Sequence, residues 1–219
     1  MAKYIIKFSK KGYIKFTSHL DMIRLFKRAF KKSEIRLKYS QGFNPHPKMT
    51  FAQPLSLGYS SEGEVLEIET KEEISCTELI DRLQNVMPIG IKILSCDIVN
   101  DQEKSFASTV DESTYKIEIE GITNFNLEKI HEFVNQDEII VKKRKKKRKH
   151  EFRDVNIKDK IRNISWENYN DNIIMYTKLD AGSESNLNPD LLLEAFFHYF
   201  GIDKNAVDIE ITRIELKCK

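Results

Sequence analysis

Three side chains near the N-terminus have the chemistry of acid–base catalysis. His19 and Asp21 lie two residues apart, and His46 lies between Pro45 and Pro47. A histidine at a helix start is kept neutral by the helix dipole, and a general base needs that state. The competing explanation is structural, because Asp21 fits a capping box and a loop histidine can simply bond a backbone carbonyl. His19 and His46 are therefore catalytic candidates only if the protein is an enzyme.

The sequence has no spacing typical of a metal site and no cofactor motif. Two histidines and one aspartate could bind a metal, but neither an i, i+4 pair nor a CxxC pair supports this. A P-loop, a dinucleotide-binding GxGxxG, a GxSxG and the CxxxCxxC of an iron–sulfur cluster are all missing. Cys76, Cys96 and Cys218 are isolated, and no apolar run approaches the ~20 residues of a membrane span. We expect a cytoplasmic protein with reduced thiols, no metal, no cofactor and no membrane partner.

The loop Tyr39–Thr50 is unusually stiff for a connection. Pro45 and Pro47 fix their own φ angles and push their predecessors toward extended conformations, while Gly42 permits a turn with positive φ. Such stiffness favours recognition of a ligand over simple connection. The side chains expected to make contacts are those of Gln41, Asn44, His46 and Lys48.

A helix that precedes this loop is expected to carry a basic face. Ser18 is its predicted N-cap, with Asp21 in the capping box, and the helix is predicted to reach about Lys32. A cationic stripe is usually only a solvated face, but one without acidic residues repels itself and favours an anionic partner. The predicted stripe comprises Arg24, Lys27, Arg28, Lys31 and Lys32. The predicted buried face comprises Leu20, Ile23, Phe26 and Phe30, with Met22 and Ala29.

A second basic segment lies far along the chain. Residues 1–48 contain 13 Lys and Arg against two acidic residues, and residues 142–162 contain 12 against three. If the two segments converge in space, they predict a polyanion site; otherwise they are two unrelated solvated surfaces. Contacts of this kind to phosphates supply affinity and salt dependence rather than sequence specificity. The uninterrupted run comprises Lys142, Lys143, Arg144, Lys145, Lys146, Lys147, Arg148 and Lys149.

The order of the expected elements predicts an α+β fold made of two tandem ferredoxin-like β-α-β-β-α-β units with antiparallel sheets. Residues 1–99 form the first expected unit, residues 100–112 a linker, and residues 113–219 the second unit. The first unit is expected to have strands at 3–9, 35–38, 51–57, 64–70 and 91–99, and helices at 19–32 and 75–86. The second is expected to have strands at 115–120, 138–143, 172–179 and 207–216, and helices at 126–135 and 190–200.

This duplication predicts equivalent places for the two basic segments. The loop after residue 38 would join strands two and three of the first unit, and a basic hairpin at 142–162 would join strands two and three of the second. If the units pack about a local two-fold axis, the segments share one rim.

Several motifs of this chain resemble the radical SAM-linked protein family, also called the DUF2344 family. The motifs are Phe16-Thr17-Ser18-His19-Leu20-Asp21, the stretch Tyr39–Phe51, Pro54-Leu55-Ser56-Leu57-Gly58 and Ser61-Glu62-Gly63-Glu64, with a further segment at Asp154–Ile161. The resemblance implies association with a radical SAM enzyme, here as a separate chain, because the catalytic module is absent from this sequence. It transfers no catalytic residue. The signature positions expected to be structural are Ser18, His19, Asp21, Gly42, Pro45 and Pro47.

Three functions follow from these observations. The leading hypothesis is a non-catalytic accessory protein that binds RNA or another phosphate-rich substrate and presents it to the radical SAM partner. The first alternative is a metal-independent RNA endonuclease or RNA-processing enzyme that uses His19 or His46 as general base. The second is a scaffold that contacts only its protein partner.

Overall fold

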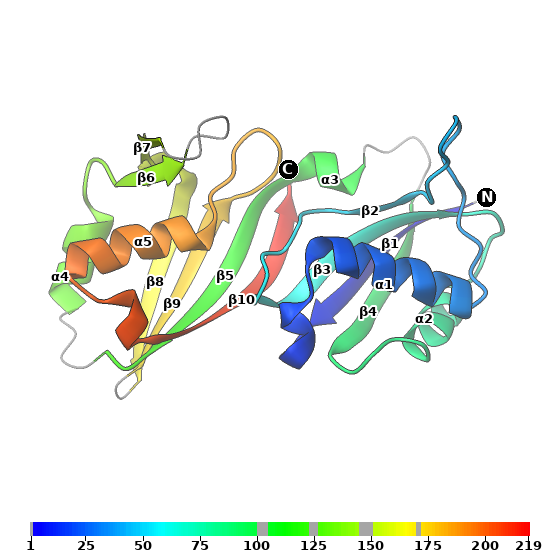
Figure 1. Ribbon diagram of the computed structural model, residues 1–219, viewed down its shortest axis with the longest axis horizontal. Helices are drawn as coiled ribbons and strands as arrows, with labels where there is room; N and C mark the ends of the chain where they lie inside the picture. The colour runs from blue at the N-terminus through cyan, green and yellow to red at the C-terminus, as the bar shows by residue number, and fades with distance from the viewer. Residues whose placement is uncertain (1, 100–104, 123–126, 145–150, 170–171) are drawn as a thin grey trace. The chain divides into compact units, whose positions relative to one another are not determined.

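The computed structural model describes residues 2–99, 105–122, 127–144, 151–169 and 172–219. The chain forms two units, the first of Met1–Asp111 with Thr212–Lys219 and the second of Glu112–Ile211. Both mix helices with strands that pair almost entirely antiparallel, so the predicted α+β class is confirmed (Figure 1). In the described ranges, no helix is both long and apolar enough to cross a membrane.

The first unit is a sheet with two helices on one face. Strand β1 is flanked by β3 and β4, and short β2 pairs with the outer side of β3, all antiparallel. Side chains alternate along β1, so Tyr4, Ile6 and Phe8 point into the core shared with α1 and α2. The elements are β1 (Ala2–Lys10), η1 (Gly12–Phe16), α1 (His19–Lys32), β2 (Met49–Phe51), β3 (Ser60–Thr70), α2 (Cys76–Gln84), β4 (Ile91–Val99) and α3 (Phe106–Thr109).

Helix α1 begins as its sequence predicts. The Ser18 hydroxyl accepts a hydrogen bond from the Asp21 N–H at 3.2 Å and donates one to the Asp21 carboxylate at 2.7 Å. The hydrogen bond from Ser18, followed by that from Arg24, holds the pKa of Asp21 below its usual value. The predicted buried face was wrong at Leu20, which is 64% exposed. The sheet-facing stripe consists of Met22, Phe26, Ala29 and Phe30, and Leu20 lies outside it.

The segment after α1 is less regular than predicted. No strand forms at residues 35–38, where Leu37 makes only a single bridge to Thr70. Strand β2 covers three residues instead of the expected 51–57, and Pro54 cannot donate a ladder hydrogen bond. Residues 33–48 therefore run from α1 to β2 without a strand of their own.

The second unit has its own sheet, in which β5 lies between β9 and β10 and β8 pairs with β9. Helix α5 begins at Pro189 with Asn188 as N-cap and ends at left-handed Gly201, as predicted. Its Phe196 stacks on Trp166 of β8 with ring centroids 5.0 Å apart. The elements are β5 (Val110–Glu120), α4 (Leu127–Val134), β6 (Ile140–Arg144), β7 (Phe152–Asn156), η2 (Lys158–Lys160), β8 (Ile161–Tyr169), β9 (Asn172–Asp180), α5 (Pro189–Phe200), η3 (Lys204–Ala206) and β10 (Asp208–Cys218).

The predicted strand at 138–143 exists as β6, but its place was wrong. It pairs with β7 in a separate two-stranded sheet, while the unpredicted β8 lies beside β9. Val141 lies opposite Val155 and Lys142 opposite Asp154, and both kinds of cross-strand pair stabilise the hairpin, whereas Lys143 lies opposite Arg153, a like charge.

Strand β10 begins in the second unit and ends in the first. Its partner β3 runs parallel to it through the pairs Thr212↔Ser60 and Arg213↔Ser61. The expected second unit, 113–219, contained all of β10, whereas the structure groups Thr212–Lys219 with the first unit. Within the expected linker 100–112, residues 100–104 lie outside the described residues, and α3 and the start of β5 follow them.

Candidate functional site

A pocket of about 980 Å³ lies in the first unit where α1, the α1–β2 connection and α2 meet. We call it the basic pocket. Seven of its fifteen lining residues are Lys, Arg or His, and two are Glu. A concave site of this size with several cations is an expected geometry for a phosphate-bearing ligand. It is lined by Lys27, Arg28, Phe30, Lys31, Glu34, Ile35, Arg36, Leu37, Tyr39, Pro45, His46, Pro47, Lys71, Glu72 and Arg82.

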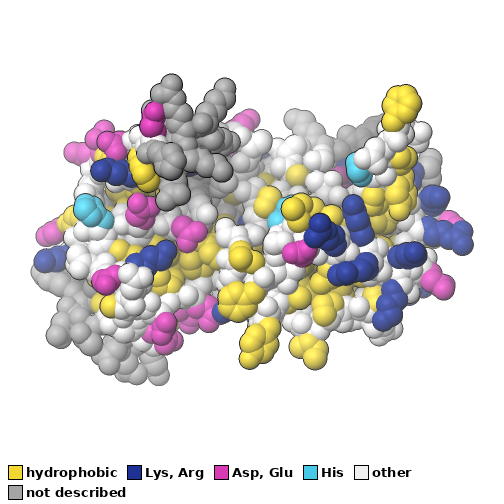
Figure 2. Space-filling view, in the orientation of Figure 1, with side chains coloured by type: hydrophobic (Ala, Val, Ile, Leu, Met, Phe, Trp, Pro, Cys, Tyr) yellow, Lys and Arg dark blue, Asp and Glu magenta, His cyan; other side chains and the backbone are white. Residues whose placement is uncertain are grey.

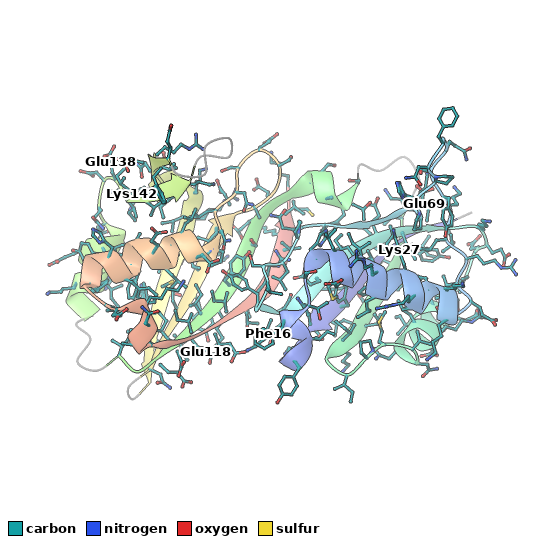
Figure 3. All side chains as sticks on the ribbon, in the orientation of Figure 1. Phe16, Lys27, Glu69, Glu118, Glu138 and Lys142 are labelled. Carbon is teal, nitrogen blue, oxygen red and sulfur yellow. The ribbon has the colours of Figure 1, made fainter. Side chains whose placement is uncertain are left out.

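Much of the pocket's positive charge is not neutralised locally. The side-chain ammonium groups of Lys27, Lys31 and Lys71 make no hydrogen bond or ion pair within the described part of the chain, whereas the Arg36 guanidinium lies 3.4 Å from the Glu72 carboxylate. Figure 2 shows Lys and Arg side chains gathered along α1, and Figure 3 labels Lys27 on that helix. Lys31 in the last turn also suits the negative end of the helix dipole. That effect does not account for Lys27, which lies more than one turn from the end, or for Lys71.

The packing of α1 fixes the direction of its cations. Phe26 packs against Phe8 with the two rings tilted and their centroids 4.9 Å apart, and Phe30 is buried. Successive residues of an α-helix are rotated by about 100°, so Lys27, Arg28 and Lys31 lie on the sides of α1 that are turned away from its buried stripe. Lys27, Arg28 and Lys31 therefore face the pocket because Phe26 and Phe30 are held in the core.

The loop Tyr39–Thr50 is closed by its own backbone. The Ser40 N–H donates to the His46 carbonyl at 2.8 Å, and the His46 N–H donates to the Ser40 hydroxyl at 3.0 Å. Tyr39 and Pro47 form a bridge just outside this pair, and Gly42 takes a φ of +125° at the tip. The predicted stiffness thus comes from a hydrogen-bonded base as well as from the prolines.

The base of the loop is anchored to β3 through a charge cluster. Glu69 accepts from Lys48 at 2.7 Å and from Lys38 at 3.1 Å. Burial would raise the pKa of Glu69, but the hydrogen bonds from Lys48 and Lys38 outweigh it and hold the pKa below its usual value. Figure 3 labels Glu69 below the loop. Lys48 is therefore already paired, and its first role is to hold the loop.

The basic pocket unites part of the predicted set. It brings the α1 cations Lys27, Arg28 and Lys31 together with His46 and its flanking prolines. Other predicted residues do not line it: Arg24, which pairs with Asp21 at 2.9 Å, and Lys32, Gln41, Gly42, Asn44 and Lys48. The prediction missed Arg36, Lys71 and Arg82, which come from three separate segments that only the tertiary fold brings together.

His19 lies at a different place from His46. Its ring packs edge-on against Phe51 at 5.5 Å and lines a cavity of about 20 Å³ with Lys10, Gln53 and Glu64. A cavity of this size holds about one water. Burial lowers the pKa of His19. The negative charge of Glu64 partly opposes this shift, and the positive charge of Lys10 reinforces it. Burial is thus the main cause of the lowered pKa of His19, where the sequence suggested the helix dipole.

Beside that cavity lies a buried charge cluster, which we call the Lys10–Glu64–Arg213 cluster. Each of the three residues is at most 4% exposed. Arg213 Nε lies 2.8 Å from Glu64 Oε1, and its Nη2 lies 2.5 Å from Oε2, with a further bond to the Gln53 carbonyl at 3.0 Å. Lys10 Nζ donates to the carbonyls of Lys15 and Thr17. Burial lowers the pKa of Lys10, and Glu64 opposes that shift.

Replacing His19 with glutamine is expected to flatten the pH dependence of stability below about pH 6.5. The folded-state pKa of His19 lies below its unfolded value of 6.5, so the unfolded chain binds an extra proton as the pH falls through that value. The wild-type protein should therefore lose stability as the pH falls below about 6.5, and the variant should retain that stability. Urea unfolding at several pH values measures both slopes. Equal slopes in the two proteins would contradict a depressed pKa at His19.

The second basic segment lies in the second unit. Lys142 and Lys143 lie on β6, where Lys142 is the register partner of Asp154 and Lys143 that of Arg153, and Arg144 ends the strand. Figure 3 labels Lys142 on β6. The remaining predicted cations, Lys145, Lys146, Lys147, Arg148 and Lys149, lie outside the described residues. The shared rim with the first basic segment stays a prediction.

Comparisons with known proteins concern family and fold. A family model described as "Uncharacterized protein conserved in bacteria" (DUF2344) matches residues 3–189. The curated proteins give no match. A chain from the crystal structure of a Cbf5-Nop10-Gar1 complex is similar over 97% of this chain with a TM-score of 0.56 and 11% identity. This chain spans 48% of that one, and the likeness shows the fold alone.

Two further solved structures are more distant. An unknown protein from Galdieria sulphuraria aligns over 98% of this chain and 99% of its own length, with 11% identity and a TM-score of 0.30. A putative glycine cleavage system transcriptional repressor aligns over 100% of this chain and 98% of its own length, with 10% identity and a TM-score of 0.24. Likenesses this weak support no statement about function. What the site does must come from its own residues.

Proposed function

The chain belongs to the DUF2344 family, and from this membership and the basic pocket we propose that it is an accessory protein that binds RNA or another phosphate-rich substrate and presents it to a radical SAM enzyme. The observation that carries the proposal is the set of pocket lysines Lys27, Lys31 and Lys71, whose ammonium groups have no ion-pair partner among the residues that the structure describes. Like charges held together gain free energy when phosphates neutralise them and release counterions. We retain a cytoplasmic location as part of the proposal.

We propose that the fold behind this site is a tandem of ferredoxin-like units. The order β1-α1-β2-β3-α2-β4, with the sheet order β4-β1-β3-β2, supports this for the first unit. In the second unit the order β5-α4-β8-β9-α5-β10 supports it once the β6–β7 hairpin is treated as an insertion. In each unit the ligand-facing segment then falls between the first helix and the second strand of the main sheet. It consists of residues 39–48 in the first unit and of the β6–β7 hairpin in the second.

The protein-partner part of the proposal is supported by an exposed apolar patch. Tyr13, Phe16, Leu20 and Leu57 are each more than 60% exposed. The Gly58 N–H donates to the Lys15 carbonyl at 2.9 Å, which holds Leu57 beside η1. Figure 2 shows hydrophobic side chains clustered over this part of the first unit, and Figure 3 labels Phe16 there. Contiguous exposed apolar side chains are typical of protein–protein contacts.

The endonuclease alternative receives less support. A histidine pair acting as base and acid needs both side chains within reach of one phosphodiester. His19 lines the small cavity beside the Lys10–Glu64–Arg213 cluster, while His46 lines the basic pocket. Either histidine alone would have to work without the other. Binding without cleavage is therefore the function that we favour.

Crosslinking in cells is expected to recover both RNA and a radical SAM protein with this chain. Phe16→Asp should remove the protein partner and leave the RNA, because a buried carboxylate would disrupt an apolar contact far more than a phosphate contact. Sequencing of the nucleic acid and mass spectrometry of the protein measure the two separately. RNA incubated with the pure protein should stay intact.

The outcomes separate the three functions. Recovery of the protein partner without nucleic acid would establish the scaffold alternative and overturn the RNA proposal. Cleavage of a bound RNA by pure protein, abolished in His19→Gln or His46→Gln, would establish the endonuclease. Loss of RNA together with partner in Phe16→Asp would show that the apolar patch is not a separate protein contact.

A further inference from the structure

We propose that the basic pocket selects an unpaired nucleic-acid strand, with one base stacked on Tyr39 and the neighbouring phosphates bound by Lys27, Lys31 and Lys71. This inference rests on the proposed function and adds the class of substrate. Four observations carry it: the exposure of Tyr39, its rigid mounting, the rings around it and the size of the pocket.

Tyr39 is an exposed aromatic residue within a pocket. It is 51% exposed and lines the basic pocket, so about half of its surface is open to a ligand. Its backbone bridges to Pro47, and the next residue, Ser40, exchanges hydrogen bonds with His46. The ring is therefore mounted on a closed backbone and loses little conformational entropy when a base stacks on it.

The neighbours of Tyr39 suit a base and a sugar. Pro45, His46 and Pro47 place further rings on the same pocket, and the α1 lysines place ammonium groups there. Aromatic rings beside cations are the combination with which proteins bind single strands, because every base has a face that can stack and every nucleotide has a phosphate. Phosphate binding alone needs the cations but gives no role to the rings.

The size of the pocket favours an unpaired strand over a paired helix as the ligand. A volume of about 980 Å³ accommodates roughly one or two nucleotides. In a duplex the bases are stacked on each other and cannot reach a ring inside a pocket, so recognition would be limited to phosphates and 2′-hydroxyls on its surface. An unpaired strand can offer a base to Tyr39 and a phosphate to Lys27 together.

Phe43 provides a matched control within the same loop. It is also aromatic and is fully exposed at the tip, but it does not line the pocket. Gly42 beside it has a φ of +125° and turns the chain there. If any exposed ring on a basic protein sufficed for stacking, Phe43 and Tyr39 would contribute equally. The pocket geometry predicts that only Tyr39 does.

Fluorescence anisotropy tests the inference with a labelled adenosine RNA of about 12 nucleotides, the same sequence as DNA, and the RNA paired with its complement. The RNA strand should bind the wild-type protein more tightly than the duplex. Tyr39→Ala should weaken strand binding about 5- to 150-fold, the range that the loss of one base stack gives. Tyr39→Phe should restore it, Tyr39→Leu should not, and Phe43→Ala should match wild type.

The results distinguish this inference from the function on which it rests. Equal affinity for strand and duplex, unchanged in Tyr39→Ala, would overturn the stacking site and leave phosphate binding intact. Equal restoration by Tyr39→Leu and Tyr39→Phe would reduce Tyr39 to loop packing and also overturn it. A failure of all three probes to bind would overturn the proposed function itself. Binding that depends on Tyr39 with DNA but not with RNA would overturn the choice of RNA.

Discussion

Replacing Glu64 with glutamine is expected to lower the free energy of unfolding of the first unit by about 3–5 kcal/mol. Glu64 is 4% exposed and is the anion of the Lys10–Glu64–Arg213 cluster. Without its charge, Arg213 and Lys10 would remain buried with no acidic counterpart in the cluster. A buried cation without a partner carries most of its desolvation penalty, whereas the intact pair offsets it.

Arg213→Met is expected to destabilise less than Glu64→Gln. The Glu64 carboxylate would then still interact with the Lys10 ammonium, since Glu64 already raises the pKa of Lys10 against the lowering by burial. Lys10 is bonded to the carbonyls of Lys15 and Thr17 and cannot replace both arginine hydrogen bonds. The double variant Arg213→Met with Glu64→Leu should recover part of the loss, because it leaves Lys10 as the one charge of the cluster.

An exposed ion pair of the same unit is the control. Lys11 lies 3.0 Å from Glu62, but both side chains are about half exposed, so Lys11→Met should change stability by about 0–1 kcal/mol. The single tryptophan, Trp166, lies in the second unit, so its fluorescence does not report on the first. Hydrogen exchange of β1 and β3 amides measures the effect directly. Equal exchange rates in Glu64→Gln and Lys11→Met would contradict the prediction.

Features set by neighbouring residues were predictable from the sequence. Ser18 and Asp21 determine how α1 begins, and Asn188, Pro189 and Gly201 determine both ends of α5. These signals act over three or four residues, because capping satisfies backbone groups of one helical turn. The helices α1, α2, α4 and α5 and most strands follow from such local rules and from alternation along each strand, whereas α3 forms within the predicted linker.

Features that depend on distant partners were not predictable. In isolation Glu64 resembles an exposed strand glutamate, and only Arg213, 149 positions later, explains its burial. The strand β8 was not predicted, because its start lies in the basic stretch 142–162. It pairs with β9 and so takes the place in the main sheet that was predicted for residues 138–143. The cationic face of α1 was visible in the sequence, but Lys71 and Arg82 joined it only through the fold.

Replacing Lys27, Lys31 and Lys71 together with glutamine is expected to make the salt dependence of RNA binding shallower. Each phosphate contact to a single strand contributes about 0.7 to the slope of log affinity against log salt, so three lost contacts should reduce it by about 2. At low salt the affinity itself should fall, because the counterions released by those contacts drive much of the binding. Anisotropy titrations at several salt concentrations measure both quantities.

A second triple variant separates the pocket from general charge. Lys92, Lys178 and Lys217 are exposed, and none of them lines the basic pocket. Their replacement with glutamine removes the same three charges, so it should lower long-range attraction equally but leave the contacts intact. The control should therefore keep nearly the wild-type slope. If it loses as much slope as the pocket variant, binding is diffuse and the pocket is not the site.

The lysines of β6 decide whether both units contact one strand. Lys142→Gln with Lys143→Gln should reduce the slope by about a further 1.4 if phosphates also reach that hairpin. Combined with the pocket variant, the two reductions should add, since each contact releases its own counterion. An unchanged slope in the β6 variant would confine binding to the basic pocket and would contradict the predicted shared rim. The same RNA and the same titration thus test the pocket, the hairpin and their convergence.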